Sequence, residues 1–135
     1  MSALDGVTPN LSALTGAQIL QTLAAATGFE WQNIESIFDK LDEEINEVKE
    51  ALVHQPRSEA HIAEELGDLL FVTTVLCRKL GLDAETVLRQ ANVKFTRRFQ
   101  KMEQLAREEN NGFSTLSIEL KRELWQRAKK EVYSE

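Results

Sequence analysis

The stretch that decides the fold is IESIFDKLDEEINEVKEAL, residues 34–52. Its large apolar side chains recur at alternating steps of four and three residues: Ile34, Phe38, Leu41, Ile45, Val48 and Leu52. That spacing places them along one stripe of an α-helix, which turns once every ~3.6 residues. The charged residues between them then face away from the stripe. The stretch therefore predicts an amphipathic helix that packs against antiparallel neighbours in a bundle.

Helical segments separated by short breaks extend on both sides of this stretch. Five helices are predicted, over residues 17–26, 31–54, 58–80, 83–109 and 116–132. Gly28, Pro56, Gly81 and residues 110–112 supply the breaks, because glycine and proline end helices. For the N-terminal caps of the last three helices we expect Ser58, Asp83 and either Ser114 or Ser117. No segment alternates for long enough to predict a strand.

The third predicted helix has a different composition from its neighbours. Over residues 69–80 it is apolar on nearly every side, and a helix of that kind is surrounded by others. Five helices offer little material to surround it, so we expect a second subunit to help. The fold class is therefore all-α, an antiparallel helical bundle of about five helices completed by dimerisation. Residues 1–15 are expected to be an N-terminal tail, and residues 16–135 a single domain.

Composition limits the functions that remain. The 135 residues carry a formal net charge of −6, with 42% hydrophobic and 28% charged residues. This acidic balance argues against nucleic-acid and membrane partners, which need a basic surface. The longest apolar run, residues 69–77, is too short to span a bilayer, and the start does not resemble a signal peptide. With a single cysteine, Cys77, the sequence predicts a cytoplasmic protein.

Two acidic pairs mark neighbouring helices. Glu44 and Glu47 lie three residues apart on the second predicted helix, and Glu65 and Asp68 lie three residues apart on the third. Three residues correspond to about 60° around a helix, so each pair shares one face. Asp68 falls among apolar residues, on a surface that should be buried. Because the break between the helices is short, both pairs should face one another across their interface.

Four carboxylates in a half-buried cleft need compensating charge. Each desolvated charge costs several kcal/mol, and like charges repel. A hard divalent cation removes both problems, and ligands that are all oxygen favour magnesium or manganese. The alternative is an acidic face exposed to water. A di-iron site is disfavoured, since neither His54 nor His61 follows a glutamate at the required spacing.

A basic edge follows on the fourth predicted helix. Arg98 lies within the apolar stripe with Lys94 beside it, and an arginine on a packing face requires an anionic partner. That partner is either one of the four carboxylates, in a structural ion pair, or a phosphate group. The scattered glycines exclude a phosphate-binding P-loop. On general grounds Trp31 and Trp125 are more typical of a core or interface than of base stacking.

Together these motifs resemble the MazG family of all-α nucleoside triphosphate pyrophosphohydrolases. The resemblance covers roughly residues 16–132 and rests on the segments Glu43-Glu44-x-x-Glu47, Glu65-Leu-Gly-Asp68 and Asn92-x-Lys94-Phe-x-x-Arg98-Phe. Gly28-Phe-Glu-Trp31 and Glu123-Leu-Trp125 extend it. It is closest to the second, catalytic domain of two-domain bacterial members, so a chain of this length corresponds to a single-domain form.

The resemblance implies roles for individual residues. Glu44, Glu47, Glu65 and Asp68 correspond to Mg²⁺ ligands, with Mn²⁺ as a substitute. Glu43 corresponds to a glutamate that activates the attacking water. Further positions correspond to residues that contact the substrate: Lys40, Lys94, Arg98, Trp125 and Trp31.

The function implied is metal-dependent hydrolysis of nucleoside triphosphates to the monophosphate and pyrophosphate, as nucleotide-pool house-cleaning by a homodimer or a higher even-numbered assembly. Two alternatives stay open. One is a narrow-specificity relative that acts on dUTP, dCTP or phosphoribosyl-ATP. The other is a non-catalytic helical module for protein interaction.

Overall fold

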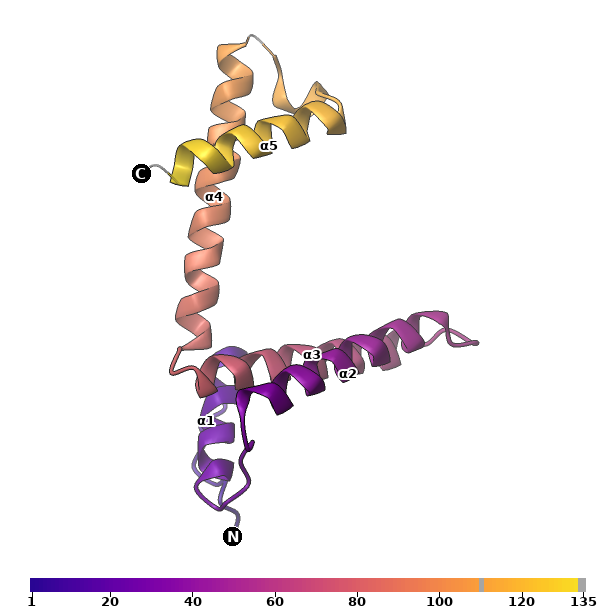
Figure 1. Ribbon diagram of the computed structural model, residues 1–135, viewed down its shortest axis with the longest axis vertical. Coiled ribbons are helices and arrows are strands. Elements are labelled where there is room, and N and C mark those ends of the chain that lie inside the picture. The colour runs from indigo at the N-terminus through magenta and orange to yellow at the C-terminus, as the bar shows by residue number, and fades with distance from the viewer. Residues whose placement is uncertain (110, 134–135) are drawn as a thin grey trace. The chain divides into compact units, whose positions relative to one another are not determined.

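The fold is built from α-helices joined by short loops (Figure 1). The computed structural model describes residues 1–109 and 111–133. Within these residues five α-helices follow one another, with one 3₁₀ turn, η1 (Phe113–Thr115), before the last. The helices are α1 (Ala13–Ala25), α2 (Ile34–Val53), α3 (Glu59–Lys79), α4 (Ala84–Glu108) and α5 (Ile118–Tyr133). The predicted all-α class is confirmed.

The signals at the helix ends act as expected. Ser58, Asp83 and Ser117 each accept a hydrogen bond from the backbone N–H three residues further on, at 3.2, 3.1 and 3.2 Å. Ser117, rather than Ser114, is therefore the cap of α5. Gly28 adopts a φ of 96°, the left-handed conformation that glycine takes most easily after a helix. Of the predicted break over residues 110–112, residue 110 lies outside the described residues.

Two helix boundaries differ from expectation by three residues or more. Helix α1 begins at Ala13, four residues before the predicted start at residue 17, so the end of the predicted tail is helical. Helix α2 begins at Ile34 rather than at residue 31, because the Asn33 side chain accepts a hydrogen bond from the N–H of Ser36 and caps the helix there.

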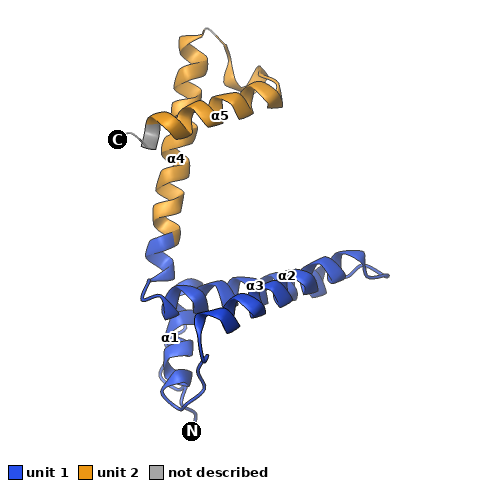
Figure 2. Cartoon of the chain, in the orientation of Figure 1, with its two compact units in different colours: residues 1–87 blue, residues 88–135 orange. Residues whose placement is uncertain are grey.

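The described chain forms two compact units, residues 1–87 and 88–135, with the boundary inside α4 (Figure 2). In the first unit α2 and α3 form an antiparallel hairpin and α1 packs against α3. Its core contains Ile37, Val72 and Val75. In the second unit α4 and α5 enclose a separate core of buried residues: Met102, Leu105, Ala106, Leu124 and Ala128.

The apolar stripe of α2 is only half covered within one chain. Ile37 is fully buried and Ile34 and Leu41 pack beside it, whereas Phe38 and Ile45 are 51% and 40% exposed. The 4-3-4 pattern correctly predicts that α2 has an apolar stripe, but it does not predict which side of the stripe is buried. Helix α3 covers the side that contains Ile37, and the side that contains Phe38 is left exposed.

Helix α3 is likewise not surrounded within one chain. Leu66 and Leu70 are exposed, with Leu70 at 63%, although α2 and α1 cover other sides of the helix. Val75, by contrast, is only 2% exposed and belongs to the core of the first unit. None of the helices in the described part combines the length and apolar composition that a membrane-spanning segment requires.

Candidate functional site

The candidate site begins with the acidic pairs of the α2–α3 hairpin. Glu44 and Glu47 lie one turn apart on α2, and Glu65 and Asp68 lie one turn apart on α3. The antiparallel pairing brings the two pairs together, and one carboxylate oxygen from each lies within 4.8 Å of all the others. The predicted clustering of these four acids is therefore present in the structure.

Burial is uneven across this acidic cluster. Glu44 is buried, Glu47 and Glu65 are half-buried, and Asp68 is exposed. The expectation of a buried Asp68 is wrong for a single chain, because this residue lies at the edge of the α2–α3 interface rather than beneath it. The cluster therefore has a closed side at Glu44 and an open side at Asp68. A small cation and a larger anion could enter from the open side.

Two oxygens of the cluster have no compensating contact. Glu44 Oε2 and Glu65 Oε2 are buried and have no hydrogen-bond partner. Burial raises the pKa of Glu44, and a hydrogen bond shared with Glu65 raises the pKa of Glu47. Buried polar atoms without partners are rare in folded proteins, and each such atom requires an explanation. A divalent cation held by carboxylate oxygens supplies one, so the residues present fit a hard metal ion.

Lys40, on α2, is a cation that lies beside the acidic cluster. Its Nζ lies 3.3 Å from Glu44 Oε1 and 3.2 Å from Glu43 Oε1, and the hydrogen bond to Glu43 is the main cause that raises the pKa of Lys40. Glu43 itself is exposed and lies outside the four-acid cluster. Lys40 thus joins Glu43 to the edge of the cluster, and each of the two residues remains accessible to a ligand.

His61 is a further neighbour of the acidic cluster, for which the sequence analysis assigned no role. Its Nδ1 lies 3.8 Å from Glu65 Oε1, and its ring meets that of His54 edge-on at 6.5 Å between centroids. The signal was present in the sequence, since His61 precedes Glu65 by four residues and therefore shares its helix face. His54 caps the C-terminal end of α2, as expected for a helix-end residue.

A largely apolar cavity lies further along α3. It has a volume of about 290 Å³, and its lining includes Trp31, Phe29, Phe71, Val72 and Val75. Phe71 and Val72 follow Asp68 by three and four residues, so the cavity begins about one helical turn beyond the acidic cluster along α3. Trp31 also packs against the core of the first unit.

Three of the residues predicted to bind substrate, Lys94, Arg98 and Trp125, belong to the second unit, whereas Lys40 and Trp31 belong to the first. Arg98 is 7% exposed, as its place in the apolar stripe predicts, and its guanidinium carbon lies 5.6 Å from the centroid of the Trp125 ring. Phe95 contacts the same ring at 5.7 Å between centroids, and Lys94 is exposed. The acidic cluster lies in the first unit. The expectation that Lys94 and Arg98 face the acids therefore stays a prediction.

Comparison with known proteins points to one family. Residues 32–102 match the family model described as the MazG nucleotide pyrophosphohydrolase domain. The chain is 40% identical, over 96% of its length, to the nucleoside triphosphate pyrophosphohydrolase of Escherichia coli K12, of which it covers 49%. It is 39% identical, over 95% of its length, to the nucleoside triphosphate pyrophosphohydrolase/pyrophosphatase MazG of Thermotoga maritima, of which it covers 48%. The chain thus spans about half the length of these relatives.

Proposed function

The chain belongs to the MazG nucleotide pyrophosphohydrolase family, and on that premise we propose that it hydrolyses nucleoside triphosphates to the monophosphate and pyrophosphate. One observation carries the proposal. Four carboxylates converge within 4.8 Å, and two of their oxygens are buried without a hydrogen-bond partner. A purely structural cluster would pair or solvate those oxygens. A site built for a cation and a polyphosphate leaves them available.

The metal in this proposal is Mg²⁺, with Mn²⁺ as a substitute. Its ligands are Glu44, Glu47, Glu65 and Asp68, whose donor atoms are all carboxylate oxygens, as hard divalent cations prefer. When bound, such a cation neutralises charge on phosphate oxygens and polarises the phosphoryl group. The protein's part is to hold the four acids together at the α2–α3 interface.

Of the remaining site residues, Glu43 acts in proton transfer and the basic residues act in substrate binding. Glu43 accepts the proton of the attacking water, and its exposed position beside Lys40 leaves it open to solvent. Water adds across the anhydride bond between the α- and β-phosphates, and the monophosphate and pyrophosphate leave. Lys40, Lys94 and Arg98 balance the charge of the triphosphate.

The two tryptophans hold the base end of the substrate in this proposal. Trp31 is supported by its place in the wall of the largely apolar cavity that begins about one turn beyond Asp68. A nucleotide whose phosphates lie at the acidic cluster would direct its base along α3 toward that cavity. Trp125 is supported by its contact with Arg98, which combines an aromatic face with a cation.

A homodimer, or a higher even-numbered assembly, is the proposed form of the protein. The support is an unpartnered apolar row on the α2–α3 hairpin, formed by Phe38, Ile45, Leu52, Leu66 and Leu70. Apolar rows of this kind mark interfaces, and a two-fold axis would place one copy of the row against another. Phe71 remains near this contact in the proposal, because it is still 44% exposed.

Product identification across a panel of triphosphates tests the function. We expect pyrophosphate and a nucleoside monophosphate as the first products, only when Mg²⁺ or Mn²⁺ is present. Orthophosphate as the first product, or full activity in excess chelator, would contradict the mechanism. Turnover of dUTP, dCTP or phosphoribosyl-ATP alone would indicate the narrow-specificity alternative. No turnover of any triphosphate would favour the non-catalytic helical module.

A further inference from the structure

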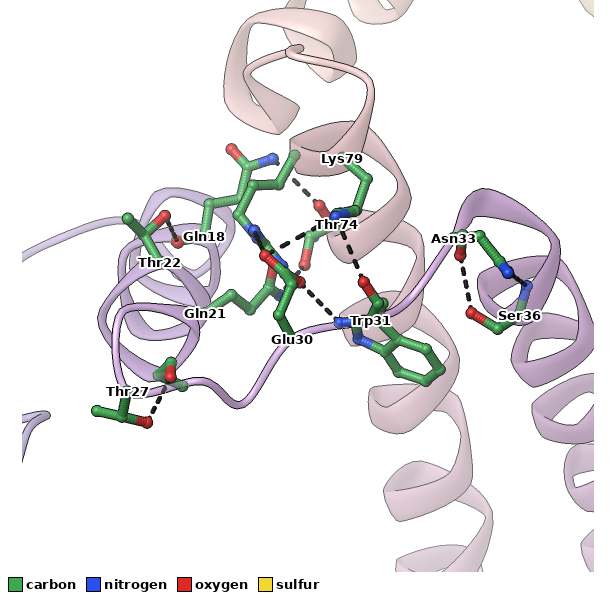
Figure 3. A network of polar contacts seen from close by, with 12 residues as sticks. Gln18, Gln21, Thr22, Thr27, Glu30, Trp31, Asn33, Ser36, Thr74 and Lys79 are labelled. Carbon is green, nitrogen blue, oxygen red and sulfur yellow. Dashed lines mark hydrogen bonds and ion pairs between the residues drawn. The ribbon is translucent and has the colours of Figure 1, made fainter.

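The segment that carries Trp31 is tied to α3 by an ion pair between Glu30 and Arg78, and Arg78 also lines the largely apolar cavity. Residues 26–33 connect α1 to α2 and pass alongside α3 (Figure 3). Arg78, near the end of α3, forms two parallel hydrogen bonds with Glu30, from Nη1 to Oε2 at 2.9 Å and from Nη2 to Oε1 at 2.8 Å. A bidentate pair of this kind fixes both position and orientation.

A residue of α1, Gln21, also contacts this ion pair. Arg78 Nε donates to Gln21 Oε1 at 3.3 Å, and Gln21 Nε2 donates to Thr74 Oγ1 at 2.8 Å. Gln21 and Thr74 are both buried. The guanidinium of Arg78 therefore cannot swing freely toward solvent, because its Nε and both Nη atoms are engaged. Its orientation is set by groups in the interior of the first unit.

Both backbone polar groups of Trp31 form hydrogen bonds with residues of this network. The Trp31 N–H donates to Glu30 Oε1 at 2.9 Å, and its carbonyl oxygen accepts a hydrogen bond from Lys79 Nζ at 3.5 Å. Lys79 Nζ also lies 3.9 Å from Glu30 Oε2. Residues in a connecting loop ordinarily lack regular backbone partners. Here Glu30 and Lys79 supply them at Trp31, whose side chain lines the cavity.

We propose that Glu30 and Arg78 are a positioning pair, which holds the Trp31 ring in the cavity wall so that it meets the nucleobase of the substrate. The inference rests on the proposed function. Trp31, Glu30 and Phe29 also line a second hollow of about 330 Å³, so Trp31 borders two hollows. The ring packs against the core of the first unit on one side, and the pair and Lys79 fix the backbone that carries it.

Enzyme kinetics of Arg78→Gln and Glu30→Gln test the pair. We expect each variant to raise KM for a nucleoside triphosphate about tenfold, with kcat changed by less than about threefold, because base binding is affected and the phosphate chemistry is not. The double variant should be no worse than either single variant, since the two residues act as a unit. Arg127→Gln is the matched control, because it breaks an exposed ion pair with Glu109 in the second unit.

Inorganic tripolyphosphate, used as a competitive inhibitor, separates positioning at the base from a general weakening of the site. Its inhibition constant should be unchanged in Arg78→Gln, since it has no base. An equal rise in this constant and in KM would overturn the proposal, as would a KM that stays at the wild-type value in both single variants.

Fluorescence of Trp31 keeps the inference independent of turnover. In a Trp125→Phe background Trp31 is the remaining tryptophan, and Arg78→Gln should shift its emission to the red and raise its quenching by acrylamide. If the wild-type chain hydrolyses no triphosphate, the proposed function fails, while this emission shift would still support the positioning role. Unchanged emission would overturn it. Should Arg78→Gln not fold, Glu30→Gln provides the same measurements.

Discussion

The two compact units of this chain treat buried charge in opposite ways. In the first unit Glu44 and its neighbours gather negative charge and leave two carboxylate oxygens without a partner. In the second unit the buried guanidinium of Arg98 lies over the Trp125 ring, whose face is electronegative. The first arrangement leaves two buried oxygen acceptors without a donor, whereas the second places its cation against an aromatic ring.

The largest effect should come from removing one acid of the first unit. Glu44→Gln should lower turnover by about a hundredfold to a thousandfold, because the proposed cation loses its most buried ligand. The variant should still fold. Since burial raises the pKa of Glu44, its ionised form costs stability at neutral pH, and the uncharged amide removes that cost.

Thermal unfolding in chelator and in Mg²⁺ checks this prediction alongside kinetics. The melting temperature of Glu44→Gln in chelator should equal or exceed that of the wild type, and its rise on adding Mg²⁺ should be smaller. Glu50→Gln, an exposed substitution on the same helix, is the control. Unfolding of Glu44→Gln in chelator would instead identify Glu44 as a structural partner of Lys40.

Assembly should depend on the first unit as well. Ile45→Glu places a charge in the apolar row of the α2–α3 hairpin, where a dimer contact would bury it without a partner. Sedimentation at micromolar concentration should show a dimer or larger even-numbered species for the wild type and a smaller species for Ile45→Glu. Ile118→Glu, at an exposed position of the second unit, should sediment like the wild type. A monomeric wild type would refute the proposed interface.

The smallest effect concerns acid stability. The hydrogen bond from Arg78 is the main cause that lowers the pKa of Glu30 from 4.5 to about 2. A depressed carboxyl pKa stabilises the folded state above the unfolded value, and this stabilisation is lost as pH falls from about 4.5 to 2. Because the pair is partly solvated, we expect about 1 kcal/mol.

Denaturant titrations of wild type and Glu30→Gln at several pH values measure this loss. The difference in unfolding free energy between the two proteins should be full at pH 6 and should shrink toward zero near pH 2. The matching difference for Glu109→Gln should be smaller at every pH, because the pair of Glu109 with Arg127 is the more exposed one. A difference for Glu30→Gln that does not change with pH would show that the pair is not what stabilises this loop.

Local signals in the sequence were sufficient to predict the helices and to identify the acidic residues that share a helix face. Ser58 and Asp83 cap helices as predicted, because a cap bonds to a backbone group only three residues away. The pairing of Glu44 with Glu47, and of Glu65 with Asp68, follows from helical geometry in the same way. By contrast, Glu30 and Arg78 are 48 residues apart, and no spacing rule links them.

By itself, then, the sequence determined that this protein is a set of amphipathic helices and which carboxylates share a face. Both follow from the fixed period of the helix, which acts within a few residues. Only the tertiary structure decided that Ile37 rather than Phe38 is buried, that Asp68 stays at the open edge of the cluster, and that Trp31 stands beside a cavity. Those outcomes depend on which segments, distant in the sequence, cover each helix. The periodic pattern within one helix carries no information about the segments that pack against it.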